Sequence, residues 1–237
     1  TWPVIETNGP PRQLSVENIQ TDLQLLTNDV WQLDNLQAQV GGASIQLSGS
    51  LTNASVIRDW KLFHRHQPPA PGTLQARLRR IADTLEEIHF ATEPEVHLDV
   101  RGDARNVENL AVRLLIQAPG ADTPWGTANG VRCELLLSPS PRTPLSRAEM
   151  TLRAANAATR WAATTNLGLT LHLFSTAQDT NIVHAELELV ADSAQSRSNR
   201  AEKIQFTAQW LHSLTNAMPL SGEGELRGAN VVTDWAR

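Results

Sequence analysis

The stretch Glu95-Val96-His97-Leu98-Asp99-Val100-Arg101 alternates polar and apolar residues without a break. Successive side chains of a β-strand point to opposite faces, so this stretch describes a ribbon with one apolar face and one polar face. The alternation returns in residues 109–117, and in residues 166–174 leucine occupies every second position from Leu167 to Leu173. The sequence therefore predicts a protein built mainly of half-buried strands.

Strands of this kind recur along most of the chain, and the segments between them carry residues typical of turns. Gly41-Gly42 predicts a hairpin, and Pro119-Gly120 and Ser138-Pro139 predict further turns. Helices that could connect parallel strands are missing from the pattern, so we expect an antiparallel meander. The predicted strands are 14–19, 22–26, 30–40, 43–51, 95–101, 109–117, 130–137, 147–154, 166–174, 183–191, 204–211 and 223–228.

One segment has a different period. In residues 73–88 apolar side chains recur in steps of four, three, four and three, which indicates an amphipathic helix. It follows a proline-rich loop at 67–72, and Pro94 ends the segment. The expected fold is mainly β, a long, curved antiparallel meander sheet with one packed helix. We expect one continuous domain made of an N-terminal β segment (1–60), the loop and helix (61–94) and a C-terminal β meander (95–237).

Composition limits the chemistry that the chain can perform. The net charge of −5 argues against nucleic acid or an anionic membrane surface as the main partner. Cys133 is the single cysteine, and His64-Arg65-His66 lacks a neighbouring carboxylate, so no disulfide or metal site is expected. No catalytic motif occurs, and we predict neither an enzyme nor a cofactor. Because the chain begins at Thr1 without methionine, we expect it to be a segment of a longer protein.

A weak internal repeat marks the ends of some strands with tryptophan. The segment from Leu51 to Trp60 matches 226–235 at a leucine, an alanine, a hydrophobic pair and a final Asp-Trp, and 152–161 is a looser copy. The repeat indicates a strand that runs into a turn. Repeated units of this kind bury their apolar faces by stacking on their neighbours. We therefore expect the repeated tryptophans to serve structural packing.

Several phrases of the sequence resemble the AsmA/TamB-like group of bacterial envelope proteins, which are built from a repeating β-groove. Residues 45–51, Ile-Gln-Leu-Ser-Gly-Ser-Leu, are similar to a strand that those proteins repeat. Residues 30–40 and Gly41-Gly42 resemble the strand and turn that precede it. Thr123-Pro124-Trp125-Gly126 is similar to a phrase in long members of the group. The loop and helix of 61–94 depart from the repeat.

This resemblance implies a strongly curved sheet whose concave apolar face holds the acyl chains of phospholipid or another lipid. It implies a periplasmic segment of a Gram-negative-type bacterium, in a parent protein anchored in the inner membrane. The expected partners are lipid and flanking segments of the same parent, with membrane contact only through anchor regions outside this chain. The candidate groove-lining residues are Val96, Leu98, Val100, Leu110, Val112, Leu114, Leu167, Leu169, Leu171 and Leu187.

A second interpretation is a β-sandwich that acts as a structural or adhesion module. There the same apolar faces would pack against each other as a closed core. Alternation alone does not separate the two, because both bury one face of every strand. An open apolar concavity favours the groove, whereas two filled sheets about 10 Å apart favour the sandwich.

Overall fold

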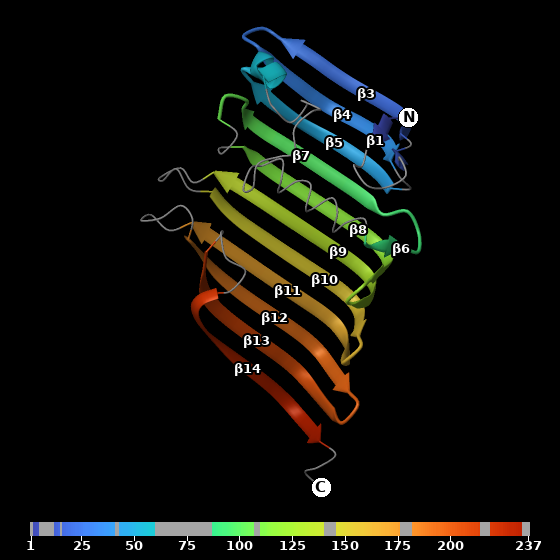
Figure 1. Cartoon of the computed structure of the whole chain (residues 1–237), viewed down its shortest axis with the longest axis vertical. Helices are drawn as coiled ribbons and strands as arrows, with labels where there is room; N and C mark the ends of the chain where they lie inside the picture. Colours follow the sequence, from blue (N-terminus) through green and yellow to red (C-terminus); the bar gives the residue numbers. More distant parts are fainter. Residues whose placement is uncertain are drawn as a thin grey trace.

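The computed structural model describes residues 2–4, 12–14, 16–40, 43–59, 87–106, 110–139, 146–175, 182–213 and 219–233. Nearly all of these residues are in strands, and one mixed sheet of twelve strands dominates the structure. Figure 1 shows the long strands side by side in a single, unclosed layer. The predicted mainly-β class and long curved sheet are confirmed.

The strands follow the sequence pattern closely but are mostly longer than predicted. The small strands β1 (Trp2–Val4) and β2 (Arg12–Leu14) form a separate two-stranded sheet. The large sheet contains β3 (Val16–Leu26), β4 (Val30–Val40), β5 (Ala43–Thr52), β6 (His89–Phe90), β7 (Glu95–Asp103), β8 (Ala111–Thr123), β9 (Gly126–Pro139), β10 (Ser146–Thr159), β11 (Ala162–Ser175), β12 (Ile182–Ser196), β13 (Asn199–Ser213) and β14 (Pro219–Thr233).

The order of strands is sequential except at one seam. From β3 to β5 and from β7 to β14 each strand is antiparallel to the next, as predicted. Between these groups β5 pairs in parallel with β7, a seam that the predicted antiparallel meander did not include. Parallel neighbours require a long crossover, which residues 53–94 supply, beginning with a 3-10 helix at Ala54–Asp59. The segments on both sides of 61–94 thus share one sheet.

Polar side chains reinforce the parallel seam. Ser48 Oγ donates a hydrogen bond to the Asp99 carboxylate (2.8 Å), and Asn53 Nδ2 donates one to the Asp103 carboxylate (2.9 Å). Both bonds join β5, or the residue that follows it, to β7. Bonds between residues so distant in sequence help to fix the register of the seam.

The predicted helix at 73–88 and the loop at 67–72 lie almost entirely outside the described residues. Of the helix, only Glu87 and Ile88 are described, and Glu87 lies in a turn whereas Ile88 is irregular. The chain then forms β6, which pairs with the Ala121–Asp122 part of β8 and which the sequence pattern did not predict.

A line of unusual backbone conformations crosses the sheet from β9 to β14. Gly130, Asn166, Lys203 and Asn230 have left-handed φ values of 61°, 50°, 51° and 51°. The pairing of neighbouring strands aligns these positions, and we name the line the crease. Pro119 of β8 lies opposite Gly130 at an unpaired position, where its missing N–H costs no ladder hydrogen bond.

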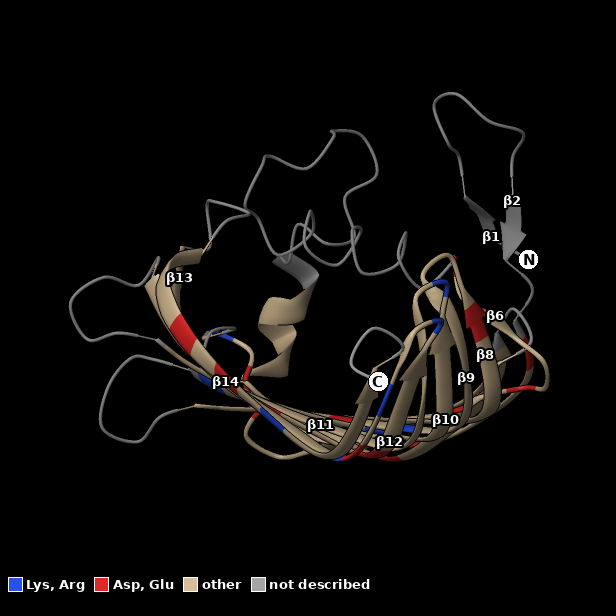
Figure 2. Ribbon diagram, turned by 90° about the horizontal axis from the view of Figure 1, so that it is seen from below, with Lys and Arg blue, Asp and Glu red and all other residues tan. Residues whose placement is uncertain are grey.

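The crease bends the strands. A left-handed residue within a strand produces a bulge and a sharp local twist. At Asn129–Gly130, Ala155–Asn156 and Thr165–Asn166 two consecutive residues are exposed. In Figure 2 the strands run around a trough like ribs, so the hairpin turns lie along its rims.

Candidate functional site

The register brings the apolar side chains of the sheet onto one face. Directly opposed residues of paired strands point to the same side, so the pairings trace rows that cross the sheet. Three rows run from β5 to β14 without a charged residue, and we name them the apolar face. The rows are Leu47, Leu98, Leu114, Leu135, Met150, Leu171, Leu187, Ala208 and Gly224; Ile45, Val96, Ile116, Cys133, Leu152, Leu169, Leu189, Phe206 and Leu226; and Gly49, Val100, Val112, Leu137, Ala148, Leu173, Ala185, Trp210 and Gly222.

The structure brings the predicted groove residues together on this face. Leu167 pairs with Ala154 and extends the face beyond the second row, and Leu110 is buried just before β8. That these residues contact lipid remains a prediction. The residues placed in the three rows are Val96, Leu98, Val100, Val112, Leu114, Leu169, Leu171 and Leu187.

The sequence-based selection omitted the apolar positions of β9 and β10, which join its two halves. Leu135 and Met150 occupy the centre of the first row, between Leu114 and Leu171. The same alternation could have identified Met150. In β9 the run of three leucines at 135–137 obscured the period, because Leu136 points to the other face, where it is 41% exposed.

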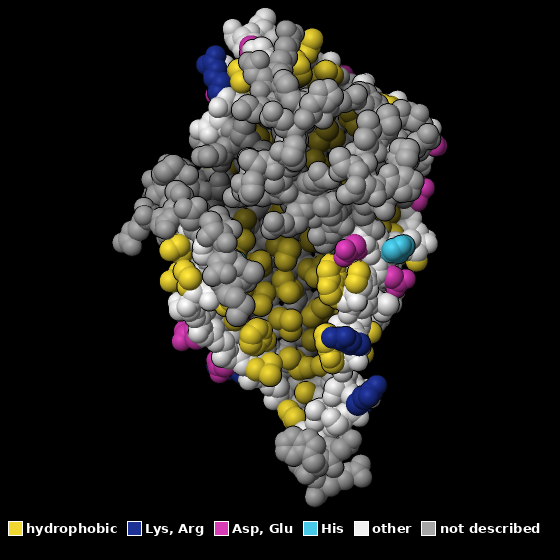
Figure 3. Space-filling view, in the orientation of Figure 1, with side chains coloured by type: hydrophobic (Ala, Val, Ile, Leu, Met, Phe, Trp, Pro, Cys, Tyr) yellow, Lys and Arg dark blue, Asp and Glu magenta, His cyan; other side chains and the backbone are white. Residues whose placement is uncertain are grey.

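Among the described residues, no second layer of structure packs on the apolar face. No large side chain of the described residues is fully buried, and the buried apolar residues are mostly alanines. Figure 3 shows a concave surface lined by hydrophobic side chains over the middle and later strands. Strands β3–β14 form one layer, and the small β1–β2 sheet cannot cover it. Within the described ranges, the two-sheet sandwich with a closed core is therefore not formed.

Cys133 lies in the middle of the apolar face, opposite Ile116 on one side and Leu152 on the other. Its side chain is partly buried, and this removal from water raises the pKa of the thiol. The thiol is therefore neutral at neutral pH, as suits an apolar surface.

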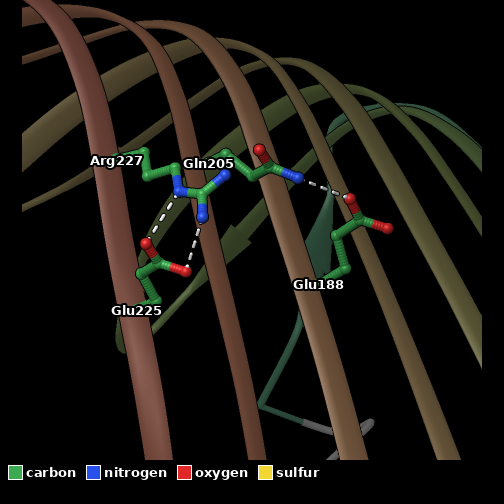
Figure 4. A network of polar contacts seen from close by, with 4 residues as sticks. All are labelled: Glu188, Gln205, Glu225 and Arg227. Atoms are coloured by element: carbon green, nitrogen blue, oxygen red, sulfur yellow. Dashed lines mark hydrogen bonds and ion pairs between the residues drawn. The ribbon is translucent and has the colours of Figure 1, made fainter.

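The opposite face of the sheet is charged and exposed to solvent. One row on this side reads Asp99, Arg113, Leu136, Glu149, His172, Glu186, Gln209 and Glu223. In Figure 4 Gln205 Nε2 donates to Glu188 (3.1 Å), and Arg227 donates two hydrogen bonds to Glu225 (2.8 and 2.9 Å). These bonds and the positive charge of Arg227 lower the pKa of Glu225.

An open hollow of about 650 Å³ lies on the charged face over β11–β14. Its carboxylates have partners: Glu188 and Glu225 bond as above, Glu223 accepts from Gln209, and Glu186 lies 3.6 Å from His184. Across the described part of the chain, no three His, Cys, Asp or Glu side chains are grouped to hold a metal ion. His64 and His66 lie outside the described residues. The hollow is a solvated polar surface, and the apolar face is the stronger candidate site.

Comparison with known proteins found no match to this chain among family models, curated proteins or solved structures. Functional inference therefore depends on the two faces of the sheet and on the sequence segments 30–42, 45–51 and 123–126. In the described residues, no helix has the length and apolar character needed to cross a bilayer.

Proposed function

We propose that this chain is a non-enzymatic lipid-handling segment of an AsmA-like envelope protein, and that its apolar face holds the acyl chains of phospholipid. The proposed setting is the periplasm of a Gram-negative-type bacterium, in a parent protein anchored in the inner membrane. One observation carries the proposal. Three uncharged rows cross nine strands on one concave face, while the opposite face is charged.

The energetics of such a face favour an acyl occupant. Each methylene removed from water contributes about 0.8 kcal/mol, so a dozen methylenes on this face contribute about 10 kcal/mol. A bilayer offers the same chain a similar apolar environment, so transfer between membrane and groove is close to balanced. With a strand spacing of about 4.8 Å, the nine strands that the three rows cross extend the face over about 40 Å. That length accommodates several lipids.

Lipid bound to the purified protein provides the direct test. Lipid is extracted into organic solvent and identified by mass spectrometry, for the wild type and two matched double variants. Leu171→Asn with Leu187→Asn places two amides on the apolar face, and Thr170→Asn with Glu188→Asn alters the neighbouring pair on the charged face. Burial of each unpaired amide under an acyl chain costs about 1–3 kcal/mol. The variant with two amides on the apolar face should therefore retain about one tenth of the wild-type lipid at most.

The charged-face variant should retain lipid as the wild type does. Urea unfolding of both variants separates loss of binding from loss of fold. Wild-type protein that carries no acyl lipid, or equal lipid in the two folded variants, contradicts the proposal.

Cys133 supplies an independent reporter within the same face. Its raised pKa predicts slow alkylation by iodoacetamide at neutral pH, and bound lipid should slow it further by covering the thiol. Delipidated protein should therefore react severalfold faster than lipid-loaded protein. An identical rate in both states would place the lipid away from Ile116, Cys133 and Leu152.

A further inference from the structure

Three hairpin turns on one rim of the trough begin with a hydroxyl side chain that accepts backbone hydrogen bonds. The turns Thr123–Gly126, Thr159–Ala162 and Ser196–Asn199 connect β8 to β9, β10 to β11 and β12 to β13. Because the consecutive strands from β8 to β13 are antiparallel, every second turn lies at the same end of the strands, and these three turns share one end. Figure 1 shows them along one side of the sheet. We name these three turns the Trp margin.

The hydroxyl at the first position of each turn organises its backbone. Thr123 Oγ1 accepts hydrogen bonds from the N–H groups of Trp125 (3.2 Å) and Gly126 (3.1 Å). Thr159 Oγ1 accepts from the N–H groups of Trp161 and Ala162, both at 3.2 Å. Ser196 Oγ accepts from Asn199 N–H in the third turn (3.1 Å). These bonds stabilise the turns without help from the indole rings.

The tryptophans themselves project into solvent. Trp125 is 59% exposed and Trp161 is 65% exposed. The expectation that the repeated tryptophans serve structural packing is thus wrong for Trp161, while Trp60 and Trp235 lie outside the described residues. The two turns are two strands apart in the sheet, or about 10 Å. Large apolar side chains aligned and exposed on one rim indicate an interaction surface.

The charge of the Trp margin differs from that of the chain. The chain has a net charge of −5, yet the three turns contain Arg160 and Arg197 and no carboxylate. The Arg160 guanidinium lies 4.0 Å from the centre of the Trp161 ring. Beyond the third turn, Arg200 is 3.5 Å from Glu202, so its charge is partly compensated. Arginine beside tryptophan suits the headgroup region of a membrane that contains anionic lipid.

We propose that the Trp margin docks onto the interfacial region of a bilayer that contains anionic phospholipid. A row of turn tips fits a planar surface better than a protein partner, because specific protein interfaces bury a broad patch of about 800 Å² on each side. If the proposed function also holds, docking of this rim lets lipid pass laterally between the bilayer and the apolar face. This differs from the expectation of membrane contact only through regions outside the chain.

Vesicle flotation tests the docking of this rim. The wild type should float with phosphatidylcholine vesicles that contain phosphatidylglycerol, and less with phosphatidylcholine alone. The double variant Trp125→Ala with Trp161→Ala should lose about tenfold in vesicle binding, because two indoles no longer enter the interface. A matched control, Leu136→Ala with Leu211→Ala, removes exposed leucines from the charged face and should float as the wild type does.

Charge is tested separately with Arg160→Ala and Arg197→Ala, which should reduce binding to the anionic vesicles to the level seen with phosphatidylcholine alone. Two results would overturn the proposal: unchanged flotation of the folded tryptophan variant, or a tryptophan-dependent self-association with no vesicle binding by the wild type. Lipid extraction keeps the two proposals distinct. A tryptophan variant that keeps its extracted lipid but no longer floats supports docking and leaves the groove intact.

Discussion

Replacement of Gly49 by alanine probes the parallel seam that unites the two halves of the sheet. Gly49 has a φ of +151°, and a Cβ at this position would overlap the carbonyl oxygen of Val100 and lie 2.9 Å from its carbonyl carbon. The obstructing atoms belong to the backbone of β7, so no side chain can move aside. The strands must separate locally or the residue must adopt a strained conformation.

The expected decrease in the free energy of unfolding has two contributions. A strained backbone conformation costs about 1–3 kcal/mol. Each ladder hydrogen bond lost between β5 and β7 adds about 1 kcal/mol. Gly49→Ala should therefore lower the free energy of unfolding by about 3 kcal/mol, and with a urea dependence of about 3 kcal/mol per molar the midpoint should fall by about 1 M.

Gly228→Ala is the matched control, since a Cβ there meets its nearest neighbours, Val231 and Ala201, at 3.7 and 3.8 Å. It should stay within about 0.5 kcal/mol of the wild type, because alanine also restricts the unfolded chain. Far-UV circular dichroism during urea titration measures both variants. Equal midpoints for Gly49→Ala and Gly228→Ala would refute the account of the seam.

Two further predictions concern the seam and the crease. Burial raises the pKa of Asp99, but hydrogen bonds from Arg101 and Ser48 and the charges of Arg101 and Arg113 lower it overall. Its stabilising effect is therefore present above the unfolded pKa of 3.8 and is lost as the pH falls through the lower folded pKa, so stability should drop more steeply below about pH 4 in the wild type than in Asp99→Asn. Lys203 is exposed with a left-handed φ of 51°, and Lys203→Asn should raise stability by up to about 1 kcal/mol, whereas Lys203→Val should lower it. Thermal unfolding compares the two Lys203 variants, and a valine variant as stable as the asparagine variant would contradict the prediction.

The sequence pattern predicted where the strands lie, but it placed the ends of several strands at the crease. The predicted strands begin or end at 130, 154, 166, 191, 204 and 228, whereas β9–β14 continue well past these positions. At Asn166, and at Gly130 in β9, the left-handed conformation changes the phase of the alternation while the ladder of hydrogen bonds goes on. Pro119-Gly120, predicted as a turn, lies inside β8, where Pro119 is opposite Gly130 of the crease. A period of two detects a strand only as long as its phase is constant.

The parallel seam could not be predicted in this way. The alternation of β5 and of β7 states which side chains share a face, but it is the same for a parallel and an antiparallel neighbour. The choice depends on where residues 53–94 return the chain to the sheet. The apolar face was more accessible to prediction, since opposed pairs such as Leu171 and Leu187 follow from the period once two strands are neighbours. The exposure of Trp161 could not be predicted from the sequence, because a turn position alone does not reveal whether its indole is packed.

If the proposed function holds, lipid has two possible routes to the apolar face, and the two sets of experiments separate them. The described sheet ends at β3 and β14, where Leu25 is 68% exposed and Leu226 is 71% exposed. Side chains that remain apolar up to an unpaired edge suit a further strand that continues the same surface, as flanking segments of a parent protein would. Lipid would then move along the trough from one end to the other. Entry over the Trp margin is lateral and requires contact with a membrane. Protein that carries lipid but does not bind vesicles would favour the route along the trough, whereas flotation that depends on Trp125 and Trp161 favours the rim.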